Sequence, residues 1–519
     1  MKRIITILFI TLSLHAFSTV RLVPSQYSTI QLALNAAKAG DTILVSKGLY
    51  RENIIWPQTN NLHLISDISS KNSAIIDGRD SGRVINVNWT GSKILLAEIN
   101  GFVIQHGFIN VPAHQGGRGA GVYALNASLK IQNCLFRENN ITSTSAIQNS
   151  GGGAALHIES TPKAYDNLIS NCVFTNNTIT EVTNGSGTAI ELDNASATVN
   201  NITVSNNSMS IDDVADGTIY AYQSNVKINA AKIENNTITT TESILQGAAA
   251  IKGGGIFIYL SNAVIANVLI DNNKLTPQNA GLALLGSGIY FYGEGSSLNI
   301  LNSTIANNIR TDGAIVNGRG VYFSTAVAKK SVIANSVIWN PGRGNQIYNQ
   351  TQKASASYCD VLDGYNGIAN INVDPQFISS NNYHLQTSSP CINIGNNKFA
   401  PAKDLDGHTR PSPDGTNADL GCYENAQNLV SSNAVAKSAS PSIHVYPNPS
   451  KGAFKLSVDE SFINSDVKLI SASGETVYQG KIQSMNTNYN FDKLPNGVYH
   501  LIITNSSQVE TSLKLVLSK

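Results

Sequence analysis

One short phrase recurs along the middle of the chain, and each copy ends in asparagine. The copies read IQNCLFREN, ISNCVFTNN, VNNITVSNN, INAAKIENN, IANVLIDNN and ILNSTIANN, and they end at Asn139, Asn177, Asn207, Asn236, Asn273 and Asn308. Successive copies are separated by 38, 30, 29, 37 and 35 residues, which is too irregular for a helical array. Each copy follows a strand that begins with glycine. A fixed strand–bend–strand unit with loops of variable length predicts a solenoid of stacked coils.

The phrase also contains an internal asparagine that fits a tight bend. It recurs at Asn133, Asn171, Asn201, Asn267, Asn302 and Asn335. In stacked coils, an asparagine amide can hydrogen-bond to its equivalent one coil away, at about 4.8 Å along the axis. We therefore interpret both sets of asparagines as structural ladders.

Composition excludes several classes of partner. The formal net charge is +1, and charged residues make up 13% of the 519 residues. Such a composition gives no excess of basic residues that could bind nucleic acid or an anionic membrane. We expect no nucleic-acid partner, no transmembrane span and a monomeric solenoid.

The first residues predict export. Lys2 and Arg3 precede an apolar run from Ile4 to Phe17, and small residues around Ser18 offer a cleavage site. This pattern is typical of a secretory signal peptide and is short for a membrane-spanning helix.

The two ends of the chain differ in pattern from its middle. From Ser28, STIQLALNAAKAGDTILV predicts a short amphipathic helix and a strand, which suits a cap on an open solenoid end. After Asn425 a stretch rich in Ser, Ala and Asn predicts a linker. From Ile443, alternating strands broken by Pro-Asn-Pro and Pro-Asn-Gly turns predict a small β-sandwich.

These residues carry two resemblances. The Gly-Gly-Gly-Ile-Phe and Asn-Asn-Thr-Ile phrases resemble the right-handed parallel β-helix superfamily, the pectin-lyase-like fold. YPNPSKG at Tyr446, LPNGVY at Leu494 and the closing KLVLSK resemble the type A sorting domain of the type IX secretion system. That second resemblance implies passage through the secretion machinery, with release or anchoring to surface lipopolysaccharide.

Together, pattern and resemblance predict an all-β chain in six parts. The parts are a signal peptide (1–18), an N-terminal cap with first coils (19–110), β-helix coils (111–345), C-terminal coils and cap (346–424), a linker (425–442) and the sorting domain (443–519).

The five cysteines have different predicted states. Cys134 and Cys172 occupy the same slot in successive repeats, which favours a stacked pair of buried thiols. Cys359 is expected to be buried and unpaired. Cys391 and Cys422 are the disulfide candidates. The segments that hold them, YHLQTSSPCINIG and DLGCYE, resemble the closing region of bacterial surface β-helices, which usually has small residues at the two cysteine positions.

Alternation along the glycine-led strands predicts which side chains face outward. On three successive coils the outward positions are aromatic, and they form a predicted exposed stripe that suits sugar rings: Phe257, Tyr259, Tyr290, Tyr292 and Tyr322. The alternative is that these rings only stabilise the sheet by stacking on one another.

The same face carries ionisable residues on earlier coils: His157, Glu159, Glu191 and Asp193. Carboxylates on adjacent coils lie about 5 Å apart, near the separation of a retaining glycosidase pair. A Ca²⁺ site formed by Glu159, Glu191 and Asp193 is one alternative, and a solvated polar patch is another. The loops between coils should wall a groove beside this face.

The sequence leaves three functions open. The first is a secreted or surface β-helix that binds an extracellular polysaccharide. The second is a polysaccharide lyase or glycoside hydrolase that uses the acidic residues of this face. The third is a structural adhesin or stalk. The enzyme motifs of polygalacturonases and pectate lyases cannot be placed on these residues, so an enzyme would rest on analogy of fold alone.

Overall fold

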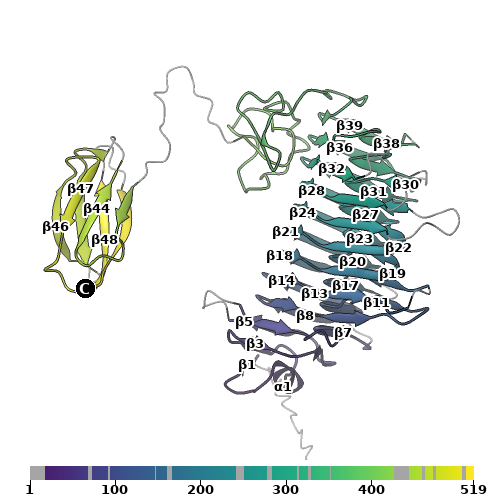
Figure 1. The fold of residues 1–519 in the computed structure, drawn as a ribbon, viewed down its shortest axis with the longest axis horizontal. Coiled ribbons are helices and arrows are strands. Elements are labelled where there is room, and N and C mark those ends of the chain that lie inside the picture. The colour runs from purple at the N-terminus through teal and green to yellow at the C-terminus, as the bar shows by residue number, and fades with distance from the viewer. Residues whose placement is uncertain are drawn as a thin grey trace, which may run out of the picture. The chain divides into compact units, whose positions relative to one another are not determined.

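The chain folds into two units, which Figure 1 shows as ribbons in a computed structural model. Contacts divide it into Met1–Asn428 and Leu429–Lys519. The described residues are 18–67, 73–91, 94–145, 148–160, 166–240, 250–277, 283–311, 315–324, 329–350, 352–425, 443–458, 462–471, 475–504 and 510–519. The predicted signal peptide and linker lie outside them, apart from Ser18 and Asn425.

The first unit is a parallel β-helix, as predicted. Three parallel sheets run along its axis, and Figure 1 shows their strands stacked coil upon coil. One coil passes from the ten-stranded sheet through two successive strands of the nineteen-stranded sheet, then out and back along the eleven-stranded sheet. These counts refer to the described residues.

The nineteen-stranded sheet forms one long side of the solenoid. Its strands are β1 (Val20–Val23), β2 (Thr42–Val45), β3 (Leu49–Tyr50), β5 (Leu62–Ser66), β6 (Ile75–Asp77), β8 (Leu95–Asn100), β9 (Val103–Gln105), β13 (Ala127–Gln132), β14 (Leu135–Arg137), β18 (Asn167–Thr175), β21 (Ala197–Ser205), β24 (Asn225–Glu234), β28 (Asn262–Asp271), β32 (Leu298–Leu301), β33 (Thr304–Ala306), β36 (Ser331–Ala334), β37 (Val337–Trp339), β39 (Ala354–Ser357) and β40 (Asp360–Val361).

The other two sheets complete each coil. The ten-stranded sheet holds β4 (Ile54–Ile55), β7 (Ile85–Asn88), β12 (Val122–Leu125), β17 (Leu156–Glu159), β20 (Ile190–Asp193), β23 (Ile219–Tyr222), β27 (Ile256–Tyr259), β31 (Ile289–Tyr292), β35 (Val321–Phe323) and β38 (Ile347–Asn349). The eleven-stranded sheet holds β10 (Phe108–Asn110), β11 (Gly116–Arg118), β15 (Asn140–Thr142), β16 (Ser150–Gly152), β19 (Thr178–Ser186), β22 (Ser208–Asp216), β25 (Thr237–Thr240), β26 (Ala250–Lys252), β29 (Lys274–Pro277), β30 (Ala283–Leu285) and β34 (Ile309–Arg310).

Two hydrophobic cores run through the solenoid. The larger core fills the interior of the coils with inward side chains such as Ile131, Phe136 and Ile158. A second core, with Ile179 and Met209, lies within the eleven-stranded sheet between its outgoing and returning segments. Two of the segments expected to be loops between coils, 180–186 and 210–216, are instead strand, in β19 and β22.

The two sets of asparagines form hydrogen-bonded ladders. In the buried ladder, Asn139 Nδ2 donates to Asn177 Oδ1 at 2.9 Å, and the same bond repeats from coil to coil as far as Asn340. The internal asparagines take left-handed backbone conformations, and Asn171 Nδ2 donates to Asn133 Oδ1 at 3.1 Å. Asparagine suits such bends because it tolerates positive φ better than most residues.

Caps cover the ends of the β-helix. Helix α1 (Ile30–Asn35) begins at the N-cap Thr29, and its Ile30, Ala33 and Leu34 are buried in the main core. Towards the C-terminus, β41 (Phe377–Ser379) pairs with β42 (Asn382–Leu385). Between the later coils and this region, Asn302 Nδ2 donates to Asp419 O at 3.1 Å, so the closing region also packs along the side of the solenoid.

All five cysteines are free and buried. The disulfide predicted between Cys391 and Cys422 is wrong. Although Cys391 O accepts from Leu420 N, the two side chains enter different apolar clusters, one with Val337 and one with Ala306. Cys134 and Cys172 are free thiols in equivalent positions, as predicted, and Cys359 is buried and unpaired.

The second unit is a small antiparallel β-sandwich. One sheet contains β43 (His444–Tyr446), β44 (Ala453–Ser457) and β47 (Asn486–Asn490). The other contains β45 (Asp466–Ser471), β46 (Thr476–Lys481), β48 (Gly497–Thr504) and β49 (Glu510–Leu517). They enclose a core that includes Phe454, Leu469 and Leu501. Across the described residues of the chain, no helix is both long and apolar enough to span a membrane.

Candidate functional site

The ten-stranded sheet presents two rows of outward side chains in register. The inner row runs through Tyr123, His157, Glu191, Tyr220, Phe257, Tyr290, Tyr322 and Tyr348. The outer row, two residues further along each strand, runs through Leu125, Glu159, Asp193, Tyr222, Tyr259 and Tyr292. All nine residues predicted for the glycan-binding or catalytic face lie in these two rows.

Glycines with positive φ set this register. Gly253 has a φ of 67°, and a Cβ there would lie 2.3 Å from the carbonyl oxygen of Ile256, so a larger residue cannot make the turn into β27. At the equivalent turn, Gly217 precedes β23 with one residue fewer than Gly253 precedes β27. Because of this one-residue difference, counting from the glycine places Tyr220 and Tyr222 on the inward side of the strand. Their outward position therefore does not follow from the sequence pattern.

The inner row is covered at Phe257, Tyr290 and Tyr322, which corrects the predicted exposed stripe at these three residues. Phe257 is only 4% exposed, Tyr290 6% and Tyr322 9%. The returning strands of the eleven-stranded sheet lie against them: Leu285 packs on the cluster, and Lys252 Nζ lies 5.9 Å from the centre of the Phe257 ring. The rings themselves stack, with the Tyr290 and Tyr322 centroids 5.0 Å apart. For this row, packing describes the rings better than sugar binding does.

Glu191 is the centre of a buried ionic cluster in the inner row. Its Oε2 lies 2.9 Å from His157 Nδ1 and 3.3 Å from Arg118 Nε, while its Oε1 accepts from Ser186 Oγ at 2.9 Å. Burial alone would raise the pKa of Glu191, but the charges of Arg118 and His157 and the hydrogen bonds hold it at about 2. Sealed in this way, Glu191 is not placed to attack a sugar.

His157 links the buried cluster to the outer row. Its Nε2 lies 3.5 Å from Glu159 Oε2, and its ring stacks on Tyr123 with centroids 5.4 Å apart. Burial alone would lower the pKa of His157, but Glu191 and Glu159 raise it above its ordinary value. The imidazole therefore acts as a bridge between two carboxylates.

The outer row remains partly exposed. Tyr222, Tyr259 and Tyr292 are half-buried, with ring centroids separated by 5.3 and 4.8 Å. Glu159 and Asp193, which are paired across adjacent coils, continue the row on its N-terminal side. The neighbouring His157 lowers the pKa of Glu159, whereas burial and the neighbouring Glu191 and Glu159 raise the pKa of Asp193.

The predicted calcium site needs the oxygens of Glu159, Glu191 and Asp193 to converge. Both oxygens of Glu191 are instead engaged by Arg118, His157 and Ser186. Within the described ranges, no group of three or more His, Cys, Asp or Glu side chains is arranged to hold a metal ion. Glu191 therefore has no unengaged oxygen to offer a cation, and a calcium site at these three carboxylates stays a prediction.

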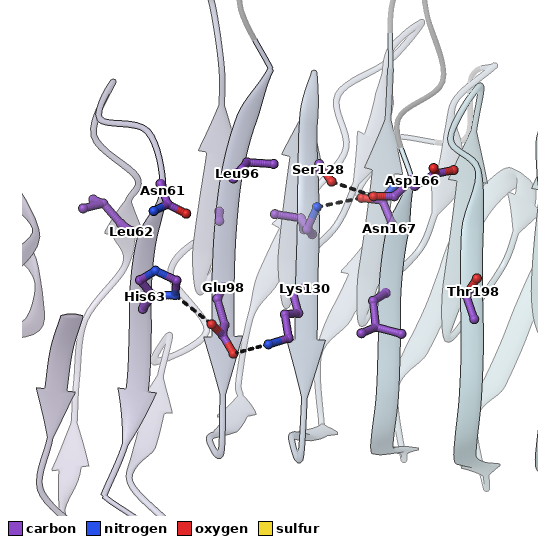
Figure 2. Close-up of a pocket in the computed structure, with 13 residues that line it drawn as sticks. Asn61, Leu62, His63, Leu96, Glu98, Ser128, Lys130, Asp166, Asn167 and Thr198 are labelled. Carbon is purple, nitrogen blue, oxygen red and sulfur yellow. Dashed lines mark hydrogen bonds and ion pairs between the residues drawn. The ribbon is translucent and has the colours of Figure 1, made fainter. Parts of the chain in front are cut away.

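A cavity that the sequence did not indicate lies on the outer face of the nineteen-stranded sheet. It has a volume of about 480 Å³ and extends across β5, β8, β13, β18 and β21. Figure 2 shows Glu98 between His63 and Lys130 on three neighbouring strands. Glu98 Oε2 lies 2.7 Å from His63 Nδ1, and Glu98 Oε1 lies 3.0 Å from Lys130 Nζ.

Comparisons with known proteins bear on the two units separately. Residues 444–518 match the family described as "Secretion system C-terminal sorting domain". A solved structure, "Crystal structure of pectate lyase Pel9A", is similar with 15% identity and a TM-score of 0.34, covering 79% of this chain and 96% of that one. A search of curated proteins found no match. The chain thus combines a parallel β-helix with a type IX secretion sorting domain, which directs it to the cell surface or the extracellular space.

Proposed function

We propose that the β-helix binds an extracellular polysaccharide through the outer row of the ten-stranded sheet. The observation that carries this proposal is the run of three half-buried tyrosines, Tyr222, Tyr259 and Tyr292, on consecutive coils. Tyrosine rings offer flat apolar faces to sugar C–H groups, and their hydroxyls can hydrogen-bond to sugar oxygens. Partial burial of the rings lowers the entropy that they lose when a ligand binds.

The neighbouring carboxylates add hydrogen-bond acceptors to the outer row. Glu159 and Asp193 can accept hydrogen bonds from sugar hydroxyls, and Tyr123 OH already donates to Glu159 Oε2 at 3.3 Å. A polymer that lies along the axis would meet an acidic section and then an aromatic one. The secretion domain supports this function, because it delivers the protein to where such polymers occur.

The test is a glycan array probed with the full chain, followed by titration of the strongest ligand. The double variant Tyr259→Ala/Tyr292→Ala should weaken binding at least tenfold, because each substitution removes a ring that stacks on a sugar. Tyr446→Ala is the matched control, because Tyr446 is an exposed tyrosine of the sorting domain. Equal binding by the double variant and the control would refute the outer row as the site.

A second candidate function is glycan cleavage, which one observation favours. Glu159 and Asp193 are partly exposed neighbours whose pKa values are shifted in opposite directions. Such a separation is typical of a general acid and its partner carboxylate. Product assays on the wild type, Glu159→Gln and Asp193→Asn test it: turnover that both substitutions abolish supports cleavage, and absence of turnover in the wild type refutes it.

A further inference from the structure

The open face of the nineteen-stranded sheet carries a second cavity beside the one in Figure 2. This second cavity has a volume of about 470 Å³ and extends over β21, β24, β28 and β32. Asp166 and Thr198 line both cavities. We call the pair the trough. Its eight strands from β5 to β32 are separated by seven steps of about 4.8 Å, so it is about 34 Å long.

One row of outward residues runs along the trough in unbroken register. It consists of His63, Glu98, Lys130, Leu168, Thr198, Lys227, Val264 and Asn299. A second lining row supplies hydroxyl, amide and carboxylate groups from Ser128, Asp166, Asn225, Asn262 and Ser297. The trough therefore mixes apolar floor positions with closely spaced polar groups.

At one end of the trough, Glu98, His63 and Lys130 hold one another in fixed positions. Burial alone would raise the pKa of Glu98, but His63 and Lys130 lower it, so the carboxylate is charged and fixed between them. Figure 2 shows this triad with the cavity-lining Leu96 on the same strand as Glu98. Lys130 is exposed, and an ammonium group has three donors, of which Glu98 uses one.

Several kinds of occupant do not fit these features. The strands of the trough have partners on both sides, so there is no free edge to which a peptide strand could add. Leu96 is the one large apolar side chain in the lining that is exposed, among residues with described placement, which is too little for an amphipathic helix. Lys130 and Lys227 are balanced by Glu98 and Asp166, so a polyanion gains little.

We propose that the trough is a second binding site, for a linear, uncharged polysaccharide that lies along the solenoid axis. Sugar hydroxyls would accept from Lys130 Nζ and donate to Asp166 at the first cavity. Apolar sugar faces would lie on Leu96 and Leu168, and the amides of Asn225 and Asn262 would meet hydroxyls further along. This site does not depend on the outer row, because it lies on a different sheet.

The proposal is tested on the full chain with cellohexaose, laminarihexaose and mannohexaose as neutral probes and hexagalacturonate as the charged one. Thr198→Arg places a long side chain where the two cavities meet. It should weaken binding of a neutral hexaose at least tenfold, as should Asp166→Ala, which leaves the strands intact. Thr237→Arg is the matched control, because Thr237 is a partly exposed threonine on β25 of another sheet.

The outcomes separate this site from the outer row. Loss of binding in Thr198→Arg and Asp166→Ala, with Thr237→Arg and Tyr259→Ala/Tyr292→Ala unchanged for the same hexaose, supports the trough. Unchanged binding in both trough variants refutes it. So does a wild type that binds none of the neutral hexaoses, or one that binds only hexagalacturonate.

Discussion

Two outward faces of the same solenoid differ in what lies on them. On the ten-stranded sheet, the returning strands of the eleven-stranded sheet cover Phe257, Tyr290 and Tyr322 of the inner row, whereas the outer row is partly exposed. On the nineteen-stranded sheet, the equivalent rows stay uncovered over β5 to β32, and two cavities remain open there. Alternation within a strand sets which side chains leave the core, but not whether another segment then covers them.

The two faces differ in how far their side chains are buried. Aromatic and ionic residues under the returning strands are packed as buried residues, and Glu191 is paired with Arg118, His157 and Ser186. Polar residues of the trough hydrogen-bond to one another across the strands, but no other segment of the described chain covers them. Substitutions of the buried inner-row residues should therefore mainly lower stability, whereas substitutions in the trough should mainly weaken binding.

The largest expected contrast is between Tyr290→Ala and Leu96→Ala. Tyr290 is buried between Phe257 and Tyr322, so truncation should lower the free energy of unfolding by about 3–5 kcal/mol. Leu96 is 47% exposed, and its truncation should cost less than about 1 kcal/mol. Urea denaturation of each variant measures both values. Equal costs would mean that the two faces are equally covered.

Next in size is the contrast between Glu191→Gln and Glu98→Gln. The pKa of Glu191 in the folded protein is about 2, below its ordinary 4.5, so its charge stabilises the fold fully above about pH 4.5. That contribution is lost as the pH falls towards 2. Glu191→Gln should cost on the order of 3 kcal/mol at pH 7, with the difference from wild type shrinking in acid. Glu98→Gln should cost less than about 1 kcal/mol, because its partners are partly exposed.

Unfolding curves at pH 7, 4.5 and 3 would measure this difference for both variants. A Glu191→Gln penalty that stays constant from pH 7 to pH 3 would contradict the charged cluster. A Glu98→Gln penalty as large as that of Glu191→Gln would contradict the open nature of the trough.

A smaller contrast separates the two asparagine ladders. Asn207 is buried and bonds to Asn236 Oδ1 at 2.9 Å, so Asn207→Ala leaves polar groups unpaired and should cost about 2 kcal/mol. Asn171 is exposed with a left-handed backbone, so Asn171→Gly keeps the bend and should change stability by less than about 1 kcal/mol. Thermal unfolding of the two variants distinguishes them, and a larger loss for Asn171→Gly would reverse the assignment.

The sequence predicts the solenoid well because coil stacking is local and repetitive. The recurring asparagines and alternating apolar residues specify the coils, and residues 444–518 carry the sorting pattern. It does not predict the covered inner row, because the returning strands belong to segments of variable length without a repeat. His63, Glu98 and Lys130 come from three coils with different loop lengths between them, so only the structure aligns them.

The proposed function depends on the outer row being the surface that a glycan touches. Hydroxyl-radical footprinting of the full chain, with and without its strongest array ligand, tests this directly. The account predicts that the ligand lowers the oxidation of Tyr222, Tyr259 and Tyr292, while oxidation of Tyr446 in the sorting domain stays the same. A ligand that leaves all three outer-row tyrosines as reactive as in the free protein would contradict the central claim.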